Sequence, residues 1–328
     1  MASTAYSWLS MGAFAVERRS LPRYLRWRLR SRTSGGRPLH RMLARQVLGL
    51  RPLPAGTPGL DASLAAADEL GVRPGWLRLA GDSQRRQVFE RDGQRVVQLF
   101  TSRAEDADKE RRVRDRVGPL APRILERCAS GMGWSEEWID GPPPRRRALR
   151  EAWAALSEHL YRPREVPRDH AVSDLRARGL APDHQPLLDA VVRGLPPRLP
   201  WSRIHGDLWL GNMGTRAQGG QRLVLFDWEY SRRGPTSYDV WSFVFQPRML
   251  SPGDPRGLVT DFDHALREVG QSSLAAHAGP LACLHMLDKL TWVRSFQGRE
   301  RALEIRNLGR WLQSLTDHVC REERAHAI

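Results

Sequence analysis

Short alternations of apolar and polar residues dominate the chain between Trp76 and Ile139. Such alternation is typical of β-strands with one buried face. The hairpin turn is expected at 91–94, because Asp92-Gly93 favours the tight primed turns. A polar helix is predicted over 102–117, and the expected strands are 77–79, 87–90, 95–100, 122–126 and 132–139. These elements predict a small β-rich domain.

The pattern changes after residues 140–144, Asp-Gly-Pro-Pro-Pro, because proline neither donates to a strand ladder nor fits a helix interior. Residues 147–161 carry apolar side chains at helical spacing, which predicts a helix with one buried face. A loop-rich stretch, a helix near 184–194 and a mainly helical region over 255–322 should follow. We therefore expect an α+β protein with a larger, mainly helical second part.

Residues 1–75 form the third predicted region, an N-terminal extension. It is basic as far as residue 51, then rich in proline and glycine, and it ends in a predicted short helix over 61–70. The expected division of the chain is thus 1–75, 76–141 and 142–328.

Composition narrows the class of protein. The chain has 328 residues, of which 41% are hydrophobic, as expected of a globular protein rather than a disordered one. Cys128, Cys283 and Cys320 are odd in number and lack metal-ligand spacing, which argues against a disulfide framework or a zinc site. No apolar run is long enough to span a membrane, and the N-terminus is a poor signal peptide. We therefore expect a cytoplasmic protein.

The formal charge of +15 is concentrated near the N-terminus, where residues 17–51 hold eleven arginines against one acid, Glu17. This segment could pack on the rest of the protein, contact an anionic membrane surface, or touch nucleic acid. Packing is the favoured interpretation and peripheral membrane contact the next. Nucleic acid is the least favoured partner, because no nucleic-acid-binding motif accompanies the charge.

Two polar motifs suggest the chemistry. Asp207 in Ile204-His205-Gly206-Asp207 is followed five residues later by Asn212, and Asp227 ends the apolar run Leu223–Phe226. Phosphoryl transfer from a nucleotide uses one aspartate to accept the proton of the attacking hydroxyl, and an asparagine and a second aspartate to hold magnesium. Either motif alone could be an ordinary turn or strand end. Both in this order and spacing predict a phosphotransferase site.

At these residues the chain resembles the aminoglycoside phosphotransferase and choline kinase family, small-molecule kinases with a bilobal protein-kinase-like fold. The resemblance implies that Asp207 is the catalytic base and that Asn212 and Asp227 bind Mg²⁺. It also implies that His205 and Gly206 shape the catalytic loop and that Asp239 braces it. ATP or GTP would be the phosphoryl donor.

The same resemblance assigns the nucleotide-binding residues of the smaller lobe. Gly81 and Ser83 would lie in the loop over the phosphates, and Glu110 on the helix that follows the third strand. Glu137 and Ile139 would lie in the hinge segment whose backbone binds the base.

One position departs from the family pattern. Gln98 stands in Val96-Val97-Gln98-Leu99-Phe100 where the family has a lysine that neutralises phosphate charge. Three explanations are open: another cation substitutes, with Arg85, Arg86 or Lys109 as candidates; the alignment is shifted by a residue or two; or the protein is an inactive kinase-like nucleotide-binding scaffold. The intact set of Asp207, Asn212 and Asp227 favours an active enzyme.

The sequence says less about the acceptor. No acidic patch for a polycationic substrate is evident, although Phe226-Asp227-Trp228-Glu229 is similar to a string in choline and ethanolamine kinases. Trp209, Trp228 and Trp241 could form a cation-π wall, stack on a sugar, or fill the core, and core filling is favoured for each. The expected acceptor is a hydroxyl of a sugar, glycan precursor, amino alcohol or aminoglycoside-like compound.

Overall fold

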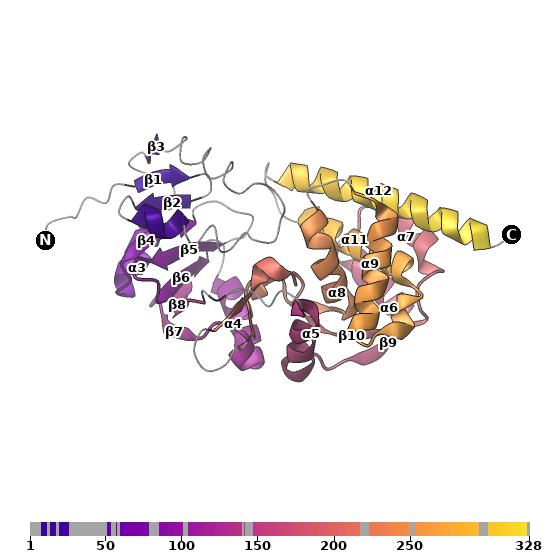
Figure 1. The fold of residues 1–328 in the computed structure, drawn as a ribbon, viewed down its shortest axis with the longest axis horizontal. Coiled ribbons are helices and arrows are strands. Elements are labelled where there is room, and N and C mark those ends of the chain that lie inside the picture. Colours follow the sequence, from indigo (N-terminus) through magenta and orange to yellow (C-terminus); the bar gives the residue numbers. More distant parts are fainter. Residues whose placement is uncertain are drawn as a thin grey trace, which may run out of the picture. The chain divides into compact units, whose positions relative to one another are not determined.

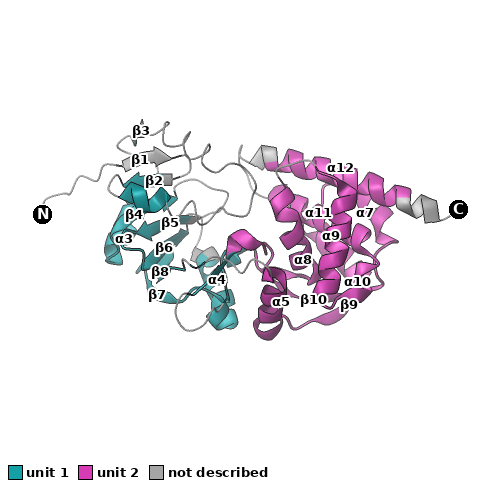
Figure 2. Ribbon diagram, in the orientation of Figure 1, with its two compact units in different colours: residues 1–144, 213–229 teal, residues 145–212, 230–328 magenta. Residues whose placement is uncertain are grey.

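The computed structural model places the chain in two compact units. The first comprises Met1–Pro144 and Met213–Glu229, and the second Arg145–Asn212 and Tyr230–Ile328 (Figure 2). The structure describes residues 8–11, 14–17, 20–25, 51–53, 57, 60–78, 85–100, 104–139, 141, 147–216, 223–249, 253–294 and 301–326. None of the helices among these residues has the length and apolar character needed to cross a bilayer.

The first unit contains an antiparallel sheet in the order β3-β1-β2-β4-β5-β6-β8-β7 (Figure 1). Helices α3 (Leu60–Glu69) and α4 (Ala104–Val117) belong to the same unit. The strands are β1 (Trp8–Met11), β2 (Phe14–Glu17), β3 (Arg51–Pro52), β4 (Pro74–Arg78), β5 (Arg85–Glu90), β6 (Arg95–Phe100), β7 (Ile124–Arg127) and β8 (Gly133–Glu137).

Alternating side chains bury both faces of this sheet, as expected because successive residues of a strand point to opposite faces. Leu77, Val88 and Val97 pack with α3 in one hydrophobic cluster. Their chain neighbours Trp76, Phe89 and Val96 form a second cluster with Val16 and Tyr24. Position 98 lies on the same side of β6 as Val96, which places the Gln98 side chain in the interior.

The strand and helix predictions for this unit are confirmed. The hairpin turn between β5 and β6 lies at the predicted residues 91–94, but the expected primed turn is wrong. The Gly93 N–H donates to the Glu90 backbone oxygen at 3.1 Å, and of the turn residues only Gly93 has a positive φ, 70°, whereas the primed types need a positive φ at a central residue before it. The predicted helices over 61–70 and 102–117 are α3 and α4, and the predicted strands are β4 to β8.

The described part of residues 1–75 continues the same sheet. β2 pairs antiparallel with β4, with Val16 opposite Trp76, and Ala15, Val16 and Tyr24 are buried. Residues 18–19 and 26–50, most of the basic segment 17–51, lie outside the described residues. Contact of that segment with an anionic membrane surface, and the cytoplasmic location, therefore stay predictions.

The second unit is mainly helical, with a three-stranded antiparallel sheet in the order β13-β10-β9. Its strands are β9 (Arg164–Pro167), β10 (Arg198–Ile204) and β13 (Arg232–Pro235). The helices of eight or more residues are α5 (Ala148–His159), α6 (Arg168–Ala177), α7 (Gln185–Val192), α8 (Ser237–Phe245), α9 (Pro255–Glu268), α11 (Ala278–Arg294) and α12 (Arg301–His326), and the short α10 spans Ser272–Ala275.

Local sequence explains how α9 begins and ends. Asp254 caps its first turn by accepting hydrogen bonds from the backbone N–H groups of Arg256 and Gly257, each at 3.0 Å. The helix ends before Gly270, whose φ of 79° suits the left-handed residue after a helix. By contrast, α11 is buried on nearly all sides and forms the centre of this unit.

Helices α5, α7 and the helical region beyond 255 confirm the predictions for the second part. The expectation of a loop-rich stretch after residue 161 is wrong, because it contains β9 and α6. The fold class is as predicted: a β-rich unit and a mainly helical one.

Candidate active site

The catalytic-loop sequence follows β10 in the second unit. Gly206 has a φ of 87°, and a Cβ atom built there would lie 2.3 Å from the backbone oxygen of Tyr230. A larger side chain would therefore clash with backbone, in addition to the strain of the left-handed conformation. The packing of the loop explains why glycine precedes Asp207.

Asp239, in the first turn of α8, holds this loop. Its Oδ2 accepts a hydrogen bond from the His205 backbone N–H at 2.7 Å and its Oδ1 one from the Gly206 N–H at 2.8 Å. The Tyr161 hydroxyl donates to the same carboxyl at 2.8 Å. Burial raises the pKa of Asp239, although these donors and His205 oppose the rise. His205 is itself fully buried, with Nδ1 3.3 Å from the Asp207 backbone nitrogen.

The Asp207 carboxylate is enclosed by donors from three parts of the second unit. Oδ2 accepts from Asn212 Nδ2 at 2.9 Å. Oδ1 accepts from Gln246 Nε2 and from Lys289 Nζ, the latter at 3.3 Å. The residue is 8% exposed. These contacts fix the orientation of the carboxylate, which a general base needs in order to meet its proton.

Asn212 is oriented by the same contacts. Its Nδ2 also donates to the Asp207 backbone oxygen at 2.8 Å, so its amide nitrogen faces Asp207. The amide oxygen consequently points away from that carboxylate. Amide and carboxylate oxygens are suitable ligands for Mg²⁺.

Asp227 lies in the first unit, two residues beyond a hairpin. Strand β11 (Met213–Thr215) pairs with β12 (Leu223–Leu225), with Met213 opposite Leu225. Among the described residues other than glycine, only Asp227 has a positive φ, which is 62°. This conformation costs on the order of 1 kcal/mol or more for a residue with a side chain and is concentrated at functional sites. The Trp228 indole N–H donates to the Leu225 oxygen at 2.8 Å and closes the turn.

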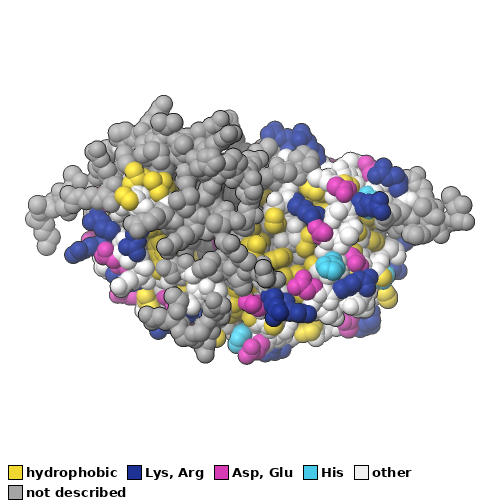
Figure 3. All heavy atoms as spheres, in the orientation of Figure 1, with side chains coloured by type: hydrophobic (Ala, Val, Ile, Leu, Met, Phe, Trp, Pro, Cys, Tyr) yellow, Lys and Arg dark blue, Asp and Glu magenta, His cyan; other side chains and the backbone are white. Residues whose placement is uncertain are grey.

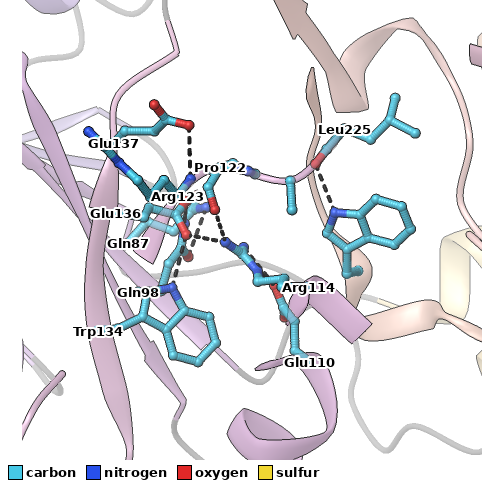
Figure 4. A network of polar contacts seen from close by, with 12 residues as sticks. Gln87, Gln98, Glu110, Arg114, Pro122, Arg123, Trp134, Glu136, Glu137 and Leu225 are labelled. Atoms are coloured by element: carbon cyan, nitrogen blue, oxygen red, sulfur yellow. Dashed lines mark hydrogen bonds and ion pairs between the residues drawn. The ribbon is translucent and has the colours of Figure 1, made fainter. Parts of the chain in front are cut away.

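The position that lacks the expected lysine belongs to a buried polar network in the first unit (Figure 4). Gln98 Nε2 donates to Glu136 Oε1 at 2.7 Å, and Gln98 Oε1 accepts from Gln87 Nε2 at 3.2 Å. Arg114 on α4 donates to Glu110 at 2.8 Å and 2.9 Å and to Glu136 Oε2 at 2.6 Å. Arg114 thus joins the helix to strand β8.

The charges of this network differ from a lysine–glutamate pair. Two buried carboxylates, Glu110 and Glu136, share the guanidinium of Arg114, which also lies 5.1 Å from the centre of the Trp134 ring. Arg114 is bonded to both acids, so these three side chains together carry no net positive charge. Of the substitute cations considered from sequence, Lys109 is exposed on α4 and the Arg85 side chain lies outside the described residues.

The hinge candidates lie at the end of β8. Glu137 Oε1 accepts from the Arg216 Nε and from the Arg123 backbone N–H, both at 2.9 Å. Partial burial would raise the pKa of Glu137, but the bonds and charges of Arg216 and Arg123 lower it overall. Ile139 is half-buried and packs near Gly214 of the β11–β12 hairpin. A role of either residue in base binding stays a prediction.

Two further expectations concern the phosphates and the metal. Gly81 and Ser83 lie outside the described residues, so their predicted phosphate contacts stay predictions. In the part of the chain that the structure describes, no three His, Cys, Asp or Glu side chains form a metal-binding group. The predicted Mg²⁺ ligands would be one amide and one carboxylate, a set that suits an ion bound chiefly by substrate phosphates and water.

Two of the three tryptophans considered for a substrate wall serve the core, and Trp209 is half-buried, so its role stays a prediction. Trp228 is 0% exposed and Trp241 1% exposed, so core filling is confirmed for both. On the face shown in Figure 3, the acidic and basic side chains of the described residues are interspersed.

Several side chains that contact the candidate groups were not found from sequence, among them Arg114, Gln246 and Lys289. Arg114 lies one helical turn after Glu110, a spacing that favours an ion pair. Gln246 and Lys289 reach Asp207 from distant helical segments, for which sequence spacing gave no signal.

Comparisons with known proteins give a family. A profile of the phosphotransferase enzyme family matches residues 75–277, more than half of the chain. No curated protein sequence matches.

Solved structures with similar folds are kinases and phosphotransferases of small molecules. Choline kinase LicA from Streptococcus pneumoniae is 14% identical, with a TM-score of 0.51, and the match covers 78% of this chain and 98% of that one. The protein in the GDP complex of aminoglycoside 2'-phosphotransferase-IIIa is 12% identical with a TM-score of 0.51, and the match covers 80% of this chain and 99% of that one. A microcompartment-associated aminopropanol kinase is 17% identical with a TM-score of 0.51, and the match covers 80% of this chain and 98% of that one. At these identities the likeness shows the fold.

Proposed function

Because the chain belongs to the phosphotransferase enzyme family, we propose that it transfers the γ-phosphoryl group of ATP or GTP to a hydroxyl of a small molecule. The observation that carries this proposal is the Asp207 carboxylate, held by Asn212, Gln246 and Lys289 in a loop that Asp239 braces. Such restraint serves a base that must meet a substrate hydroxyl in one orientation.

Asp207 would accept the proton of the acceptor hydroxyl. The acceptor oxygen then forms a bond to the γ-phosphorus, while the bond from that phosphorus to the β–γ bridging oxygen breaks and its electron pair leaves with the nucleoside diphosphate. Correct placement of a general base typically contributes about 10²–10⁴ in rate.

Asn212 and Asp227 would hold Mg²⁺, which neutralises the charge on the phosphates when bound. The orientation of Asn212 supports this assignment, because the contact with Asp207 occupies its amide nitrogen and leaves its oxygen for a ligand. The left-handed backbone of Asp227 supports it as well, since strain of this kind is retained where the side chain has a task.

Sugars, glycan precursors, amino alcohols and aminoglycoside-like compounds are the acceptors to test first. The aromatic pair beside Asp207 is already covered by a cation of the protein. Lys289 Nζ lies 5.2 Å from the Trp292 ring centre and 5.9 Å from that of Tyr230. A cationic acceptor would have to displace that ammonium to use the same ring faces, so this pair does not favour a quaternary amine over the other acceptors.

A nucleotide-binding scaffold without turnover is the second candidate. It is favoured by the network in the first unit, where Gln98 carries no charge and Arg114 is bonded to Glu110 and Glu136. Losing one charged contact to the transition state typically costs about 2.7–4 kcal/mol, or on the order of 10²–10³ in rate.

The experiment has two steps. Thermal unfolding is followed with ATP or GTP, each with magnesium or with EDTA, and a magnesium-dependent rise in melting temperature is expected for at least one nucleotide. Release of the nucleoside diphosphate is then measured across a panel of hydroxyl compounds. Acceptor-dependent release supports the enzyme, binding without release supports the scaffold, and neither binding nor release contradicts both.

A further inference from the structure

Lys289 is a buried basic residue beside the candidate base. It lies on α11 in the second unit and is 5% exposed. Its Nζ donates to Asp207 Oδ1 at 3.3 Å. The ammonium also lies over the rings of Tyr230 and Trp292, which pack edge to face with their centres 4.4 Å apart.

The ammonium has more hydrogen-bonding capacity than its described contacts use. A lysine ammonium carries three N–H donors. Asp207 takes one of them, and the ring faces offer weaker acceptors. The neighbouring acid, Asp288, is bonded to Arg178 and Arg232 instead. A buried charge with donors to spare is costly unless a further acceptor meets it, and phosphoryl oxygens are strong acceptors.

The choice of lysine is informative in this chain. Only Lys109 and Lys289 are lysines among the 52 lysines and arginines. The buried acid next to Lys289 on α11, Asp288, is neutralised by two arginines. An arginine could neutralise Asp207 in the same way. The ammonium of a lysine is a compact charge whose single nitrogen can donate to oxygens of two different groups, whereas a guanidinium presents its donors in a planar fork.

We infer that Lys289 is a catalytic residue of the proposed phosphoryl transfer, on which this inference rests. Its ammonium holds Asp207 Oδ1 and donates to an oxygen of the γ-phosphoryl group as that group moves from the nucleotide to the acceptor hydroxyl. Negative charge is spread over the equatorial phosphoryl oxygens in this transition state. Lys289 therefore supplies a positive charge that Gln98 does not, and it supplies it next to the base.

The test compares Lys289→Met and Lys289→Arg with the wild type. Methionine keeps the length of the side chain without its charge, and arginine keeps the charge in another shape. Arg267→Met is the control, because Arg267 is a cation on α9 of the same unit whose side chain is 54% exposed. Each protein is assayed for phosphate release from magnesium-ATP with water as acceptor, and for transfer to a hydroxyl compound that the wild type phosphorylates. Affinity for the magnesium complex of a non-hydrolysable ATP analogue is measured separately.

We expect Lys289→Met to lower kcat by about 100-fold or more, as for the loss of one donor to a developing oxyanion. Nucleotide affinity and acceptor KM should change by less than about threefold, because the contact strengthens only in the transition state. Lys289→Arg should restore less than about a tenth of the kcat that Lys289→Met loses, because the planar guanidinium does not reproduce the compact charge of the ammonium. Arg267→Met should behave as the wild type.

Other results would distinguish a failure of the role of Lys289 from a failure of the proposed phosphotransferase function. If the wild type binds and transfers but Lys289→Met keeps its kcat, the catalytic role is overturned and the proposed function stands. If the wild type shows no transfer to water or to any hydroxyl compound, the proposed function fails and the inference with it. A parallel loss of melting temperature and nucleotide affinity in Lys289→Met would show a structural role. Lys289→Gln, which keeps a polar end, is the second variant, and unfolding of both would likewise overturn the inference.

Discussion

Removing the guanidinium of Arg114 should destabilise the protein far more than removing a surface arginine from the same helix. Arg114 is 4% exposed and joins Glu110 and Glu136, which are 0% and 4% exposed. Arg114→Met keeps most of the side-chain volume and leaves two buried carboxylates without their cation. Breaking a buried ion pair in this way typically costs about 3–5 kcal/mol.

Arg111→Met is the control, because Arg111 and Asp108 form a partly exposed pair on α4, with side chains 30% and 51% exposed. An exposed pair contributes about 0.2–1 kcal/mol. Denaturant unfolding of both variants, followed by tryptophan fluorescence, measures the difference. Trp134 reports locally, since its Nε1 donates to Glu136 at 2.9 Å.

Adding Glu110→Gln and Glu136→Gln to Arg114→Met should recover much of the lost free energy, because removing all the buried charges is far less costly than leaving two unpaired. If Arg114→Met costs no more than Arg111→Met, the network does not stabilise the first unit and this reasoning is refuted. If the triple variant is no more stable than Arg114→Met, the cost arises from packing rather than charge.

Two more predictions concern the metal and acid stability. Asp227→Gly removes the proposed metal ligand but keeps a backbone that can adopt the φ of 62°. Magnesium-dependent nucleotide affinity should therefore be lost, while the melting temperature of the nucleotide-free protein changes little. Unchanged affinity in a titration with magnesium-ATP would exclude the ligand role. Burial lowers the pKa of His285 from an ordinary 6.5 to about 3. Between pH 6.5 and pH 3 the unfolded chain therefore binds a proton at His285 that the folded protein does not bind. The free energy of unfolding consequently falls as the pH falls, by about 1.4 kcal/mol per pH unit. His285→Gln should therefore lose about 2 kcal/mol less than the wild type between pH 7 and pH 5, as measured by denaturant unfolding, and equal losses would contradict the assignment.

The sequence was sufficient for elements whose pattern is local. Strands β5 and β6 and the position of their Asp92-Gly93 turn follow from alternation and turn chemistry alone. The spacing of Asp207, Asn212 and Asp227 likewise needed no structure. The position of Gln98 and its lack of charge were also visible in the sequence.

Elements whose pattern depends on tertiary contacts could not be predicted. β10 contains Pro200, which argues against a strand, yet it lies between β9 and β13. Helix α8 is buried on nearly all sides and so shows no polar face. The same reason hid Lys289, because α11 is buried all round and its contact with Asp207 spans 82 positions of sequence. Side chains that converge from distant segments leave no local signal.

The most direct test of the account is the rate of phosphoryl transfer by Asp207→Asn. The acceptor is a hydroxyl compound that the wild type phosphorylates, and affinity for the magnesium–nucleotide complex is measured beside it. We expect kcat to fall by a factor of about 10²–10⁴ with affinity nearly unchanged, because the amide cannot accept the proton of the acceptor hydroxyl. A variant that transfers phosphoryl groups at close to the wild-type rate would contradict the role of Asp207 and the mechanism built on it.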